Sequence, residues 1–251
     1  MAPRYAAHRG GAGLWPENSL LAFRSAIALG AGILELDVHA TADGRVAVIH
    51  DATLERTTDG RGPVSGCTAA ELARLRLRGP DGALTAEHPP LLDAVAALVA
   101  PTAVELLVEI KERSVGVAYD GLEARVLAVL DAAGIGDRAN VMGFDPGVVK
   151  RVRALAPRQR TTLLVGRGEL GRDAPSVEPV RWAQALGASD LGLDYRLVDA
   201  AVVKAARAVG IAVGAWTVND EKAMQRLIAL GVDVITTDRP DLAARVLKAR
   251  P

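Results

Sequence analysis

Two carboxylates on one predicted strand are the first residues whose spacing suggests chemistry. In residues 33–38, two leucines alternate with Glu35 and Asp37, so the acidic side chains share one face of the strand. Their Cα atoms would lie about 6.6 Å apart, at about 3.3 Å per residue, and both side chains could reach one cation. The apolar flanks predict an enclosed space around them; the alternative is a surface hairpin whose polar face is solvated.

Two histidines could supply acid and base groups. Asp43-Gly44 is a strong hairpin turn signal, and the chain returns through residues 46–49 to His50. The hairpin would bring His50 back to about the level of the carboxylates. His8 ends a short apolar segment near the N-terminus. Both imidazoles titrate near neutral pH and could move protons; the alternative for each is a buried side chain bonded to the backbone.

A second strand, residues 104–111, repeats this spacing. Its Glu109 and Lys111 point to the same mouth as the first two carboxylates. Oxygen-only ligands suit Mg²⁺ or Ca²⁺ and disfavour zinc. Three carboxylates would repel each other unless a cation and a basic group lay among them. The predicted metal ligands are Glu35, Asp37 and Glu109.

Two cationic side chains complete the predicted site. Arg9 offers a planar fork and Lys111 a point charge, and both suit phosphate. Two imidazoles, a divalent cation and two cationic side chains fit metal-assisted phosphodiester cleavage. In that chemistry one histidine removes a proton from the nucleophile and the other protonates the leaving alkoxide.

Five other residues have simpler explanations. His39 is expected up the hairpin stem, and His88 in a loop before two prolines. Trp216 either packs inside the fold or lines the pocket and contacts the substrate. Asn219 and Asp238 are expected as N-caps of the helices that follow them.

The elements that must hold these side chains alternate regularly. Strands are predicted to begin near residues 5, 33, 104, 139, 161, 190, 211 and 232. Helices are predicted over residues 91–100, 118–133, 146–156, 177–186, 198–209 and 220–230, with one more before the second strand and one at the end. Eight βα units in 251 residues favour a closed α/β (β/α)8 TIM barrel, and no Gly-x-Gly-x-x-Gly follows a strand. Such barrels carry their active sites at the C-terminal ends of the strands, where the polar residues cluster.

Residues 52–90 interrupt this alternation. They are rich in turn residues, and Thr68 and Glu71 form a capping box that begins a short helix. We interpret the segment as a small insertion over the barrel, after the hairpin of the second strand and without a core of its own. Residues 1–251 are then one domain.

Composition disfavours several classes of partner. Lys plus Arg and Asp plus Glu number 30 each and aromatic residues are 3 %, so nucleic acid and anionic membrane surfaces are not expected. Cys67 is the only cysteine, which excludes an internal disulfide. The N-terminal residues lack the apolar core of a signal peptide, and charged residues interrupt the apolar region 91–108. We therefore expect a cytoplasmic protein without stable membrane association.

The sequence resembles the glycerophosphodiester phosphodiesterase family over almost its whole length. The motifs that carry the resemblance are His8-Arg9-Gly10, Pro16-Glu17-Asn18-Ser19, Glu35-Leu36-Asp37-Val38, Thr41-Ala42-Asp43-Gly44, His50-Asp51, Leu54-Glu55-Arg56-Thr57-Thr58, Glu109-Ile110-Lys111, Trp216-Thr217-Val218-Asn219 and Thr237-Asp238-Arg239-Pro240. The resemblance implies a TIM barrel that hydrolyses glycerophosphodiesters to sn-glycerol 3-phosphate and an alcohol. It implies one Mg²⁺ or Ca²⁺ on the three carboxylates, His8 and His50 as the catalytic pair, and phosphate contacts at Arg9 and Lys111.

Two places depart from the family pattern. Gly143 stands where serine is common, which would remove a hydroxyl near the pocket, and Pro90-Leu91-Leu92-Asp93 replaces a Pro-Thr-Leu-Glu-like helix start. These departures leave the preferred alcohol open. One alternative is a phospholipase D-like or cyclising phosphodiesterase acting on lysophospholipids. Another is a non-catalytic phosphate-binding barrel, which would be free to lose part of the acid, base and metal set.

Overall fold

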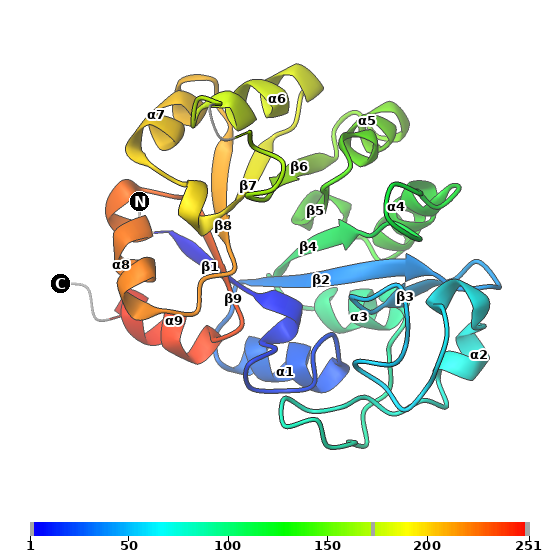
Figure 1. The fold of residues 1–251 in the computed structure, drawn as a ribbon. Coiled ribbons are helices and arrows are strands. Elements are labelled where there is room, and N and C mark those ends of the chain that lie inside the picture. The colour runs from blue at the N-terminus through cyan, green and yellow to red at the C-terminus, as the bar shows by residue number, and fades with distance from the viewer. Residues whose placement is uncertain (1–2, 172–173, 249–251) are drawn as a thin grey trace.

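Eight parallel strands close into a barrel in the computed structural model, which describes residues 3–171 and 174–248 (Figure 1). The barrel strands are β1 (Arg4–Ala7), β2 (Ile33–Ala40), β4 (Glu105–Ile110), β5 (Ala139–Gly143), β6 (Arg160–Val165), β7 (Asp190–Asp194), β8 (Ala212–Trp216) and β9 (Val234–Thr237). Neighbours in this order pair in parallel, and β1 pairs with both β2 and β9, which closes the sheet. The predicted (β/α)8 barrel is confirmed.

A ring of helices surrounds the barrel (Figure 1). They are α1 (Leu20–Ala28), α3 (Leu92–Val99), α4 (Leu122–Ala132), α5 (Pro146–Leu155), α6 (Glu178–Leu186), α7 (Ala200–Ala208), α8 (Glu221–Leu230) and α9 (Pro240–Lys248). α4 starts at Leu122 rather than at residue 118, directly after Gly121 in the left-handed region with φ 66°. Among the described helices, none combines the length and the apolar character needed to cross a bilayer.

The outer faces of the barrel strands fix their register. On β2, the outward-facing Leu34 and Leu36 are fully buried in a core that also holds Phe23 of α1. Burying each such side chain contributes about 1.5–3 kcal/mol. Because side chains alternate between the two faces, a shift by one residue would expose these leucines to the barrel interior and turn the carboxylates toward the helices. The packing of the helices therefore decides which residues face the barrel axis.

The hairpin after β2 behaves as predicted. β3 (Val46–Val48) returns antiparallel to β2, with Val48 opposite Val38. The Ile49 N–H then donates to the Asp37 carbonyl at 3.0 Å. This hydrogen bond places His50 beside the part of β2 that carries the carboxylates.

Residues 52–90 lie beside this hairpin and include α2 (Ala69–Leu72), which begins with the predicted capping box. Their apolar side chains pack with β3 and the residue after it into a small cluster of Ala47, Ile49, Leu54, Val64 and Leu72. Because two of these five residues belong to the hairpin, the segment packs onto the hairpin and does not enclose a core of its own. Irregular spacing along a turn-rich sequence hid these few core positions, because it has no helical or strand period.

Candidate active site

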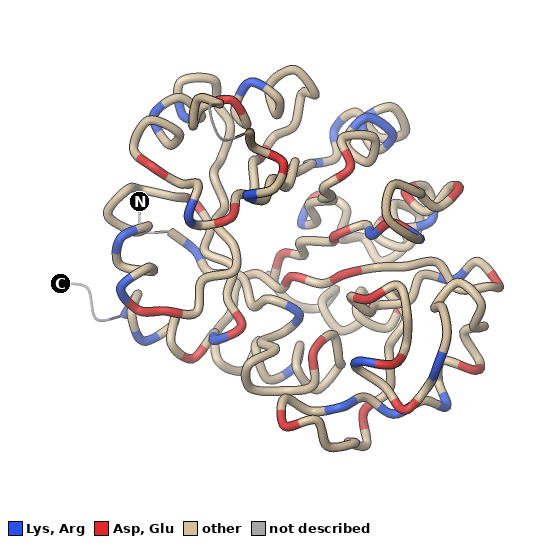
Figure 2. The backbone as a smooth tube through the Cα atoms, in the orientation of Figure 1, with Lys and Arg blue, Asp and Glu red and all other residues tan. Residues whose placement is uncertain are grey.

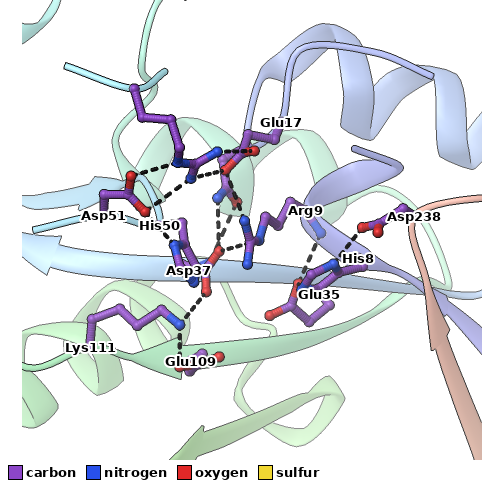
Figure 3. Close-up of polar contacts among 12 residues, drawn as sticks. His8, Arg9, Glu17, Glu35, Asp37, His50, Asp51, Glu109, Lys111 and Asp238 are labelled. Atoms are coloured by element: carbon purple, nitrogen blue, oxygen red, sulfur yellow. Dashed lines mark hydrogen bonds and ion pairs between the residues drawn. The ribbon is translucent and has the colours of Figure 1, made fainter. Parts of the chain in front are cut away.

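Three carboxylates face one another in the barrel, on two strands that are neighbours in space (Figure 3). β2 pairs with β4, and Asp37 lies opposite Glu109. Glu35, Asp37 and Glu109 are 1 %, 0 % and 7 % exposed. One oxygen of each lies within 4.8 Å of the others. The structure thus brings the three predicted metal ligands together, although a hairpin and an insertion separate their strands in the sequence.

Two cationic side chains lie among these carboxylates. Lys111 Nζ is 3.0 Å from Asp37 Oδ1 and also contacts Glu109 Oε1. Arg9 has a left-handed backbone, and its N–H donates to Glu35 Oε2 at 2.9 Å. Its Nε lies 3.2 Å from Asp37 Oδ2. Three carboxylates and two cations leave one negative charge in excess when all are ionised.

The carboxylates differ in their affinity for a proton. Burial, with Asp37 and Glu109 nearby, raises the pKa of Glu35 to about 7. Burial also disfavours charge on Asp37, but Lys111 and Arg9 outweigh it and hold the pKa of Asp37 well below its usual range. Burial raises the pKa of Glu109 as well. The ionised forms of Glu35 and Glu109 are therefore disfavoured, and additional positive charge beside them would favour ionisation.

The cluster fits a hard divalent cation. Its candidate ligands are all carboxylate oxygens, the donors that Mg²⁺ and Ca²⁺ prefer. Asp37 Oδ1 is buried and accepts no well-aligned hydrogen bond, although Lys111 lies nearby. A cation would satisfy that oxygen and reverse the excess negative charge.

Asn18 holds Asp37 in place. It is buried with φ 56°, and its Nδ2 donates to Asp37 Oδ2 at 2.9 Å. Ser19, not Asn18, caps α1 by accepting from the Ala22 N–H. Sequence reasoning missed this contact because either residue could serve as the cap. The available signal was two cap-type residues side by side before a helix that needs one.

His8 lies at the C-terminal end of β1 and contacts two carboxylates. Its Nδ1 is 2.6 Å from Asp238 Oδ1, and its Nε2 is 3.8 Å from Glu35 Oε2. Burial disfavours the imidazolium, but Glu35 and Asp238 outweigh this effect and raise the pKa of His8. Asp238 is close because β9 pairs with β1.

The expectation that Asn219 and Asp238 cap helices is wrong. Asp220 caps α8 by accepting from the Ala223 N–H. Asn219 Nδ2 donates to Asp238 Oδ2 at 2.6 Å, and Asn219 Oδ1 accepts from the Asp238 N–H at 2.9 Å. Contacts between the ends of β8 and β9 therefore replace local capping, and they orient the carboxylate that meets His8.

His50 has a matching aspartate, held by an arginine from the insertion. His50 Nδ1 is 2.6 Å from Asp51 Oδ1. Arg56 Nε donates to Asp51 Oδ2 at 2.6 Å, and its two Nη atoms donate to Glu17 at 2.8 Å. Glu17 in turn accepts from Arg9 at 3.1 Å. Burial disfavours charge on Asp51, yet Arg56 and His50 lower its pKa to about 2. Burial and the nearby Lys111 lower the pKa of His50.

These groups border a cavity that runs from the mouth into the barrel. Its lining includes His8, Arg9, Glu35, His50, Glu109 and Lys111, but no residue of the 52–90 segment. Trp216 also lines the cavity, where its ring meets that of Phe144 edge to face with centroids 5.3 Å apart.

A Cβ at Gly143 would meet Val148 of α5 at 3.1 Å. A serine at 143 would therefore point to that helix, which corrects the expectation of a lost hydroxyl near the pocket.

Comparisons with known proteins agree with this geometry. Residues 8–242 match the Glycerophosphoryl diester phosphodiesterase family. The chain is 32 % identical over 243 residues to the glycerophosphodiester phosphodiesterase of Caldanaerobacter subterraneus subsp. tengcongensis, covering 96 % of both chains.

Solved structures give the same result. A putative glycerophosphoryl diester phosphodiesterase from Silicibacter pomeroyi is similar with a TM-score of 0.90 and 28 % identity, covering 98 % of this chain and 93 % of the other. An Oleispira antarctica phosphodiesterase in complex with the product sn-glycerol-3-phosphate is similar with a TM-score of 0.85 and 27 % identity, covering 99 % and 98 %. The expected family is confirmed: the chain belongs to the glycerophosphoryl diester phosphodiesterase family.

Proposed function

We propose that the protein hydrolyses glycerophosphodiesters to sn-glycerol 3-phosphate and an alcohol, with one Mg²⁺ or Ca²⁺ on Glu35, Asp37 and Glu109. The observation that carries this proposal is one cavity lined by two imidazoles, two cationic side chains, Glu35 and Glu109, with the third carboxylate, Asp37, buried beside them. The Oleispira antarctica relative, whose structure contains sn-glycerol-3-phosphate, supports the product. A bound divalent cation would lower the pKa of a hydroxyl that it ligates and offset charge on the phosphate.

The aspartate contacts support separate roles for the two histidines. Each Nδ1 is engaged by an aspartate, which leaves each Nε2 for the substrate. His8 has a raised pKa and favours the charged form, so it acts as the acid. His50 has a lowered pKa and favours the neutral form, so it acts as the base.

The nucleophile in this proposal is the hydroxyl on glycerol carbon 2. His50 removes its proton, its oxygen attacks phosphorus, and the bond from phosphorus to the alcohol oxygen breaks as His8 donates a proton to that oxygen. His8 then removes a proton from water, whose oxygen attacks phosphorus, and the bond from phosphorus to the oxygen on carbon 2 breaks as His50 returns a proton to that oxygen, which leaves sn-glycerol 3-phosphate. An internal nucleophile has a large effective-molarity advantage over water.

Arg9, Lys111 and Trp216 hold the substrate in this proposal. The guanidinium and the ammonium group offset charge that builds on the phosphoryl oxygens. The ring of Trp216 forms an apolar wall with Phe144. We infer a small-molecule substrate rather than nucleic acid, because acidic and basic residues are interspersed along the chain (Figure 2) and the formal net charge is zero. A cytoplasmic location without stable membrane association stays part of the proposal.

Phosphorus NMR of the products tests the proposal. Glycerophosphocholine, glycerophosphoethanolamine and lysophosphatidylcholine are each incubated with enzyme and Mg²⁺ or Ca²⁺. Formation of sn-glycerol 3-phosphate from the first two supports it. Turnover of lysophosphatidylcholine alone would indicate a phospholipase D-like or cyclising enzyme, and no turnover of any substrate would indicate a non-catalytic phosphate-binding barrel.

A further inference from the structure

His39 and Tyr119 form a hydrogen-bonded pair behind the backbone of His50. His39 is 1 % exposed, and its Nε2 lies 2.9 Å from the carbonyl oxygen of His50. Its Nδ1 lies 2.9 Å from the hydroxyl of Tyr119, which is half-buried in the loop between β4 and α4. The two rings meet edge to face with centroids 5.7 Å apart. The pair therefore links the end of β2 and the residue His50 to the loop between β4 and α4.

The direction of each hydrogen bond is determined by its partner. A carbonyl oxygen can only accept, so Nε2 of His39 carries the hydrogen. In the neutral imidazole, Nδ1 then accepts, and the Tyr119 hydroxyl donates to it. The network satisfies both ring nitrogens of His39 and the carbonyl of His50 at once. Without His39, the carbonyl of His50 would lose this side-chain hydrogen bond.

The contact of His39 with the His50 carbonyl holds the backbone of His50, the residue of the hairpin that acts in the proposed reaction. The Ile49 N–H, just before His50, donates to the Asp37 carbonyl at 3.0 Å, and the His50 carbonyl accepts from His39. Both anchors belong to β2, the strand that carries two of the three carboxylates. The backbone of His50 is thus tied to β2 on both sides, while Asp51 holds its ring.

We propose that His39 and Tyr119 are positioning residues, which set the place of the His50 imidazole relative to the reacting phosphodiester. The inference rests on the proposed function, in which His50 is the base. It predicts that loss of the pair impairs turnover and not the binding of substrate or cation.

The test compares His39→Leu, His39→Gln and Tyr119→Phe with the matched control His88→Leu. His88 also contacts a backbone carbonyl, that of Leu75, but in the insertion. With glycerophosphocholine, His39→Leu should lower kcat about 100-fold, the effect of a misplacement of about 1 Å, with KM changed less than about threefold. Gln can donate to the same carbonyl and should recover kcat to within about tenfold of wild type. Tyr119→Phe should lower kcat about three- to tenfold, because it removes only the outer hydrogen bond. His88→Leu should be unchanged.

Calorimetric titration with Mg²⁺ or Ca²⁺ separates this role from an effect on the neighbouring metal ligand. Cation affinity should be the same in wild type and His39→Leu. If the affinity of His39→Leu for the cation falls in step with its kcat, the inference is overturned. It is also overturned if His39→Leu keeps the wild-type kcat while His50→Ala is inactive. If His39→Leu does not fold, Tyr119→Phe decides, and an unchanged kcat in that variant overturns the inference. Full activity of His50→Ala would be a different failure, that of the role proposed for His50 itself.

Discussion

At alkaline pH and without metal, Glu35→Gln should have a larger unfolding free energy than the wild type, although the substitution weakens catalysis. In EDTA, Glu35 has only protein groups around it, and burial with Asp37 and Glu109 nearby raises its pKa from 4.5 to about 7. A raised pKa means that the folded protein binds more protons than the unfolded chain between these values. The contribution of Glu35 to the unfolding free energy therefore falls as the pH rises from 4.5 to 7. At about 1.4 kcal/mol per tenfold change in proton affinity, the loss is about 3 kcal/mol.

Glutamine keeps an oxygen that can accept from the Arg9 N–H but cannot ionise. Urea unfolding in EDTA at pH 5 and pH 8, followed by the fluorescence of the three tryptophans, measures the effect. The wild-type-minus-variant difference in unfolding free energy should change by about 2–3 kcal/mol between the two pH values, in favour of the variant at pH 8, because part of the loss has already occurred at pH 5. Taking this difference removes effects that both proteins share. Glu221→Gln, at an exposed carboxylate of α8, controls for the loss of one charge. Parallel pH dependence of wild type and Glu35→Gln would refute the reasoning.

Four further variants test the histidine pair and the aspartates that hold it. On a p-nitrophenyl phosphodiester of glycerol, the leaving group needs no general acid. With this substrate, His8→Ala should regain much of the rate that it loses with glycerophosphocholine, and His50→Ala should not. Recovery only in His50→Ala would mean that the two histidines have the opposite roles. Asp238→Asn should lower kcat about 10- to 100-fold, because it removes a charge-assisted hydrogen bond that contributes about 1.5–3 kcal/mol. It should also move the alkaline limb of the pH–rate profile to lower pH, because His8 loses a group that raises its pKa. An unmoved limb would count against His8 as the acid. Arg56→Met should lower kcat. It should change the unfolding free energy by less than about 1 kcal/mol, because Arg56 is half exposed and such ion pairs contribute little to stability. A kcat equal to that of the wild type would show that Asp51 does not need the contact with Arg56.

The barrel and its acidic cluster were accessible from the sequence because both follow from periodicity. Alternation along β2 and β4 placed Glu35, Asp37 and Glu109 on inner faces, and the order of the strands made the two strands neighbours. The Asp43-Gly44 turn fixed the level of His50. These features depend on a period of two and on a local turn, so a single sequence carries enough information to predict them.

The residues that orient the histidines were not accessible in this way. Asp238 meets His8 only because the last strand closes the barrel against the first, and its type and position fit a helix cap equally well. Asn18 beside Ser19 had the same ambiguity. The contact of His39 with Tyr119 joins residues 80 apart in the sequence, on a strand and a loop. Long-range side-chain contacts of this kind have no local pattern.

The departures from the family pattern are explained only by the structure. Gly143 faces Val148 of α5 and not the cavity, so its difference from serine acts on packing. Leu91 stands at the N-cap of α3 without a side-chain hydrogen bond to the helix, whereas threonine could supply one. The substrate comparison above measures which alcohol the enzyme that carries both departures prefers.

The most direct test of the central claim is a phosphorus NMR time course of glycerophosphocholine with EDTA-treated enzyme, before and after addition of Mg²⁺ or Ca²⁺. The account predicts no turnover in EDTA, formation of sn-glycerol 3-phosphate once either cation is added, and a higher cation requirement for Glu35→Gln because one anionic ligand becomes neutral. Full activity of thoroughly demetallated enzyme would contradict it.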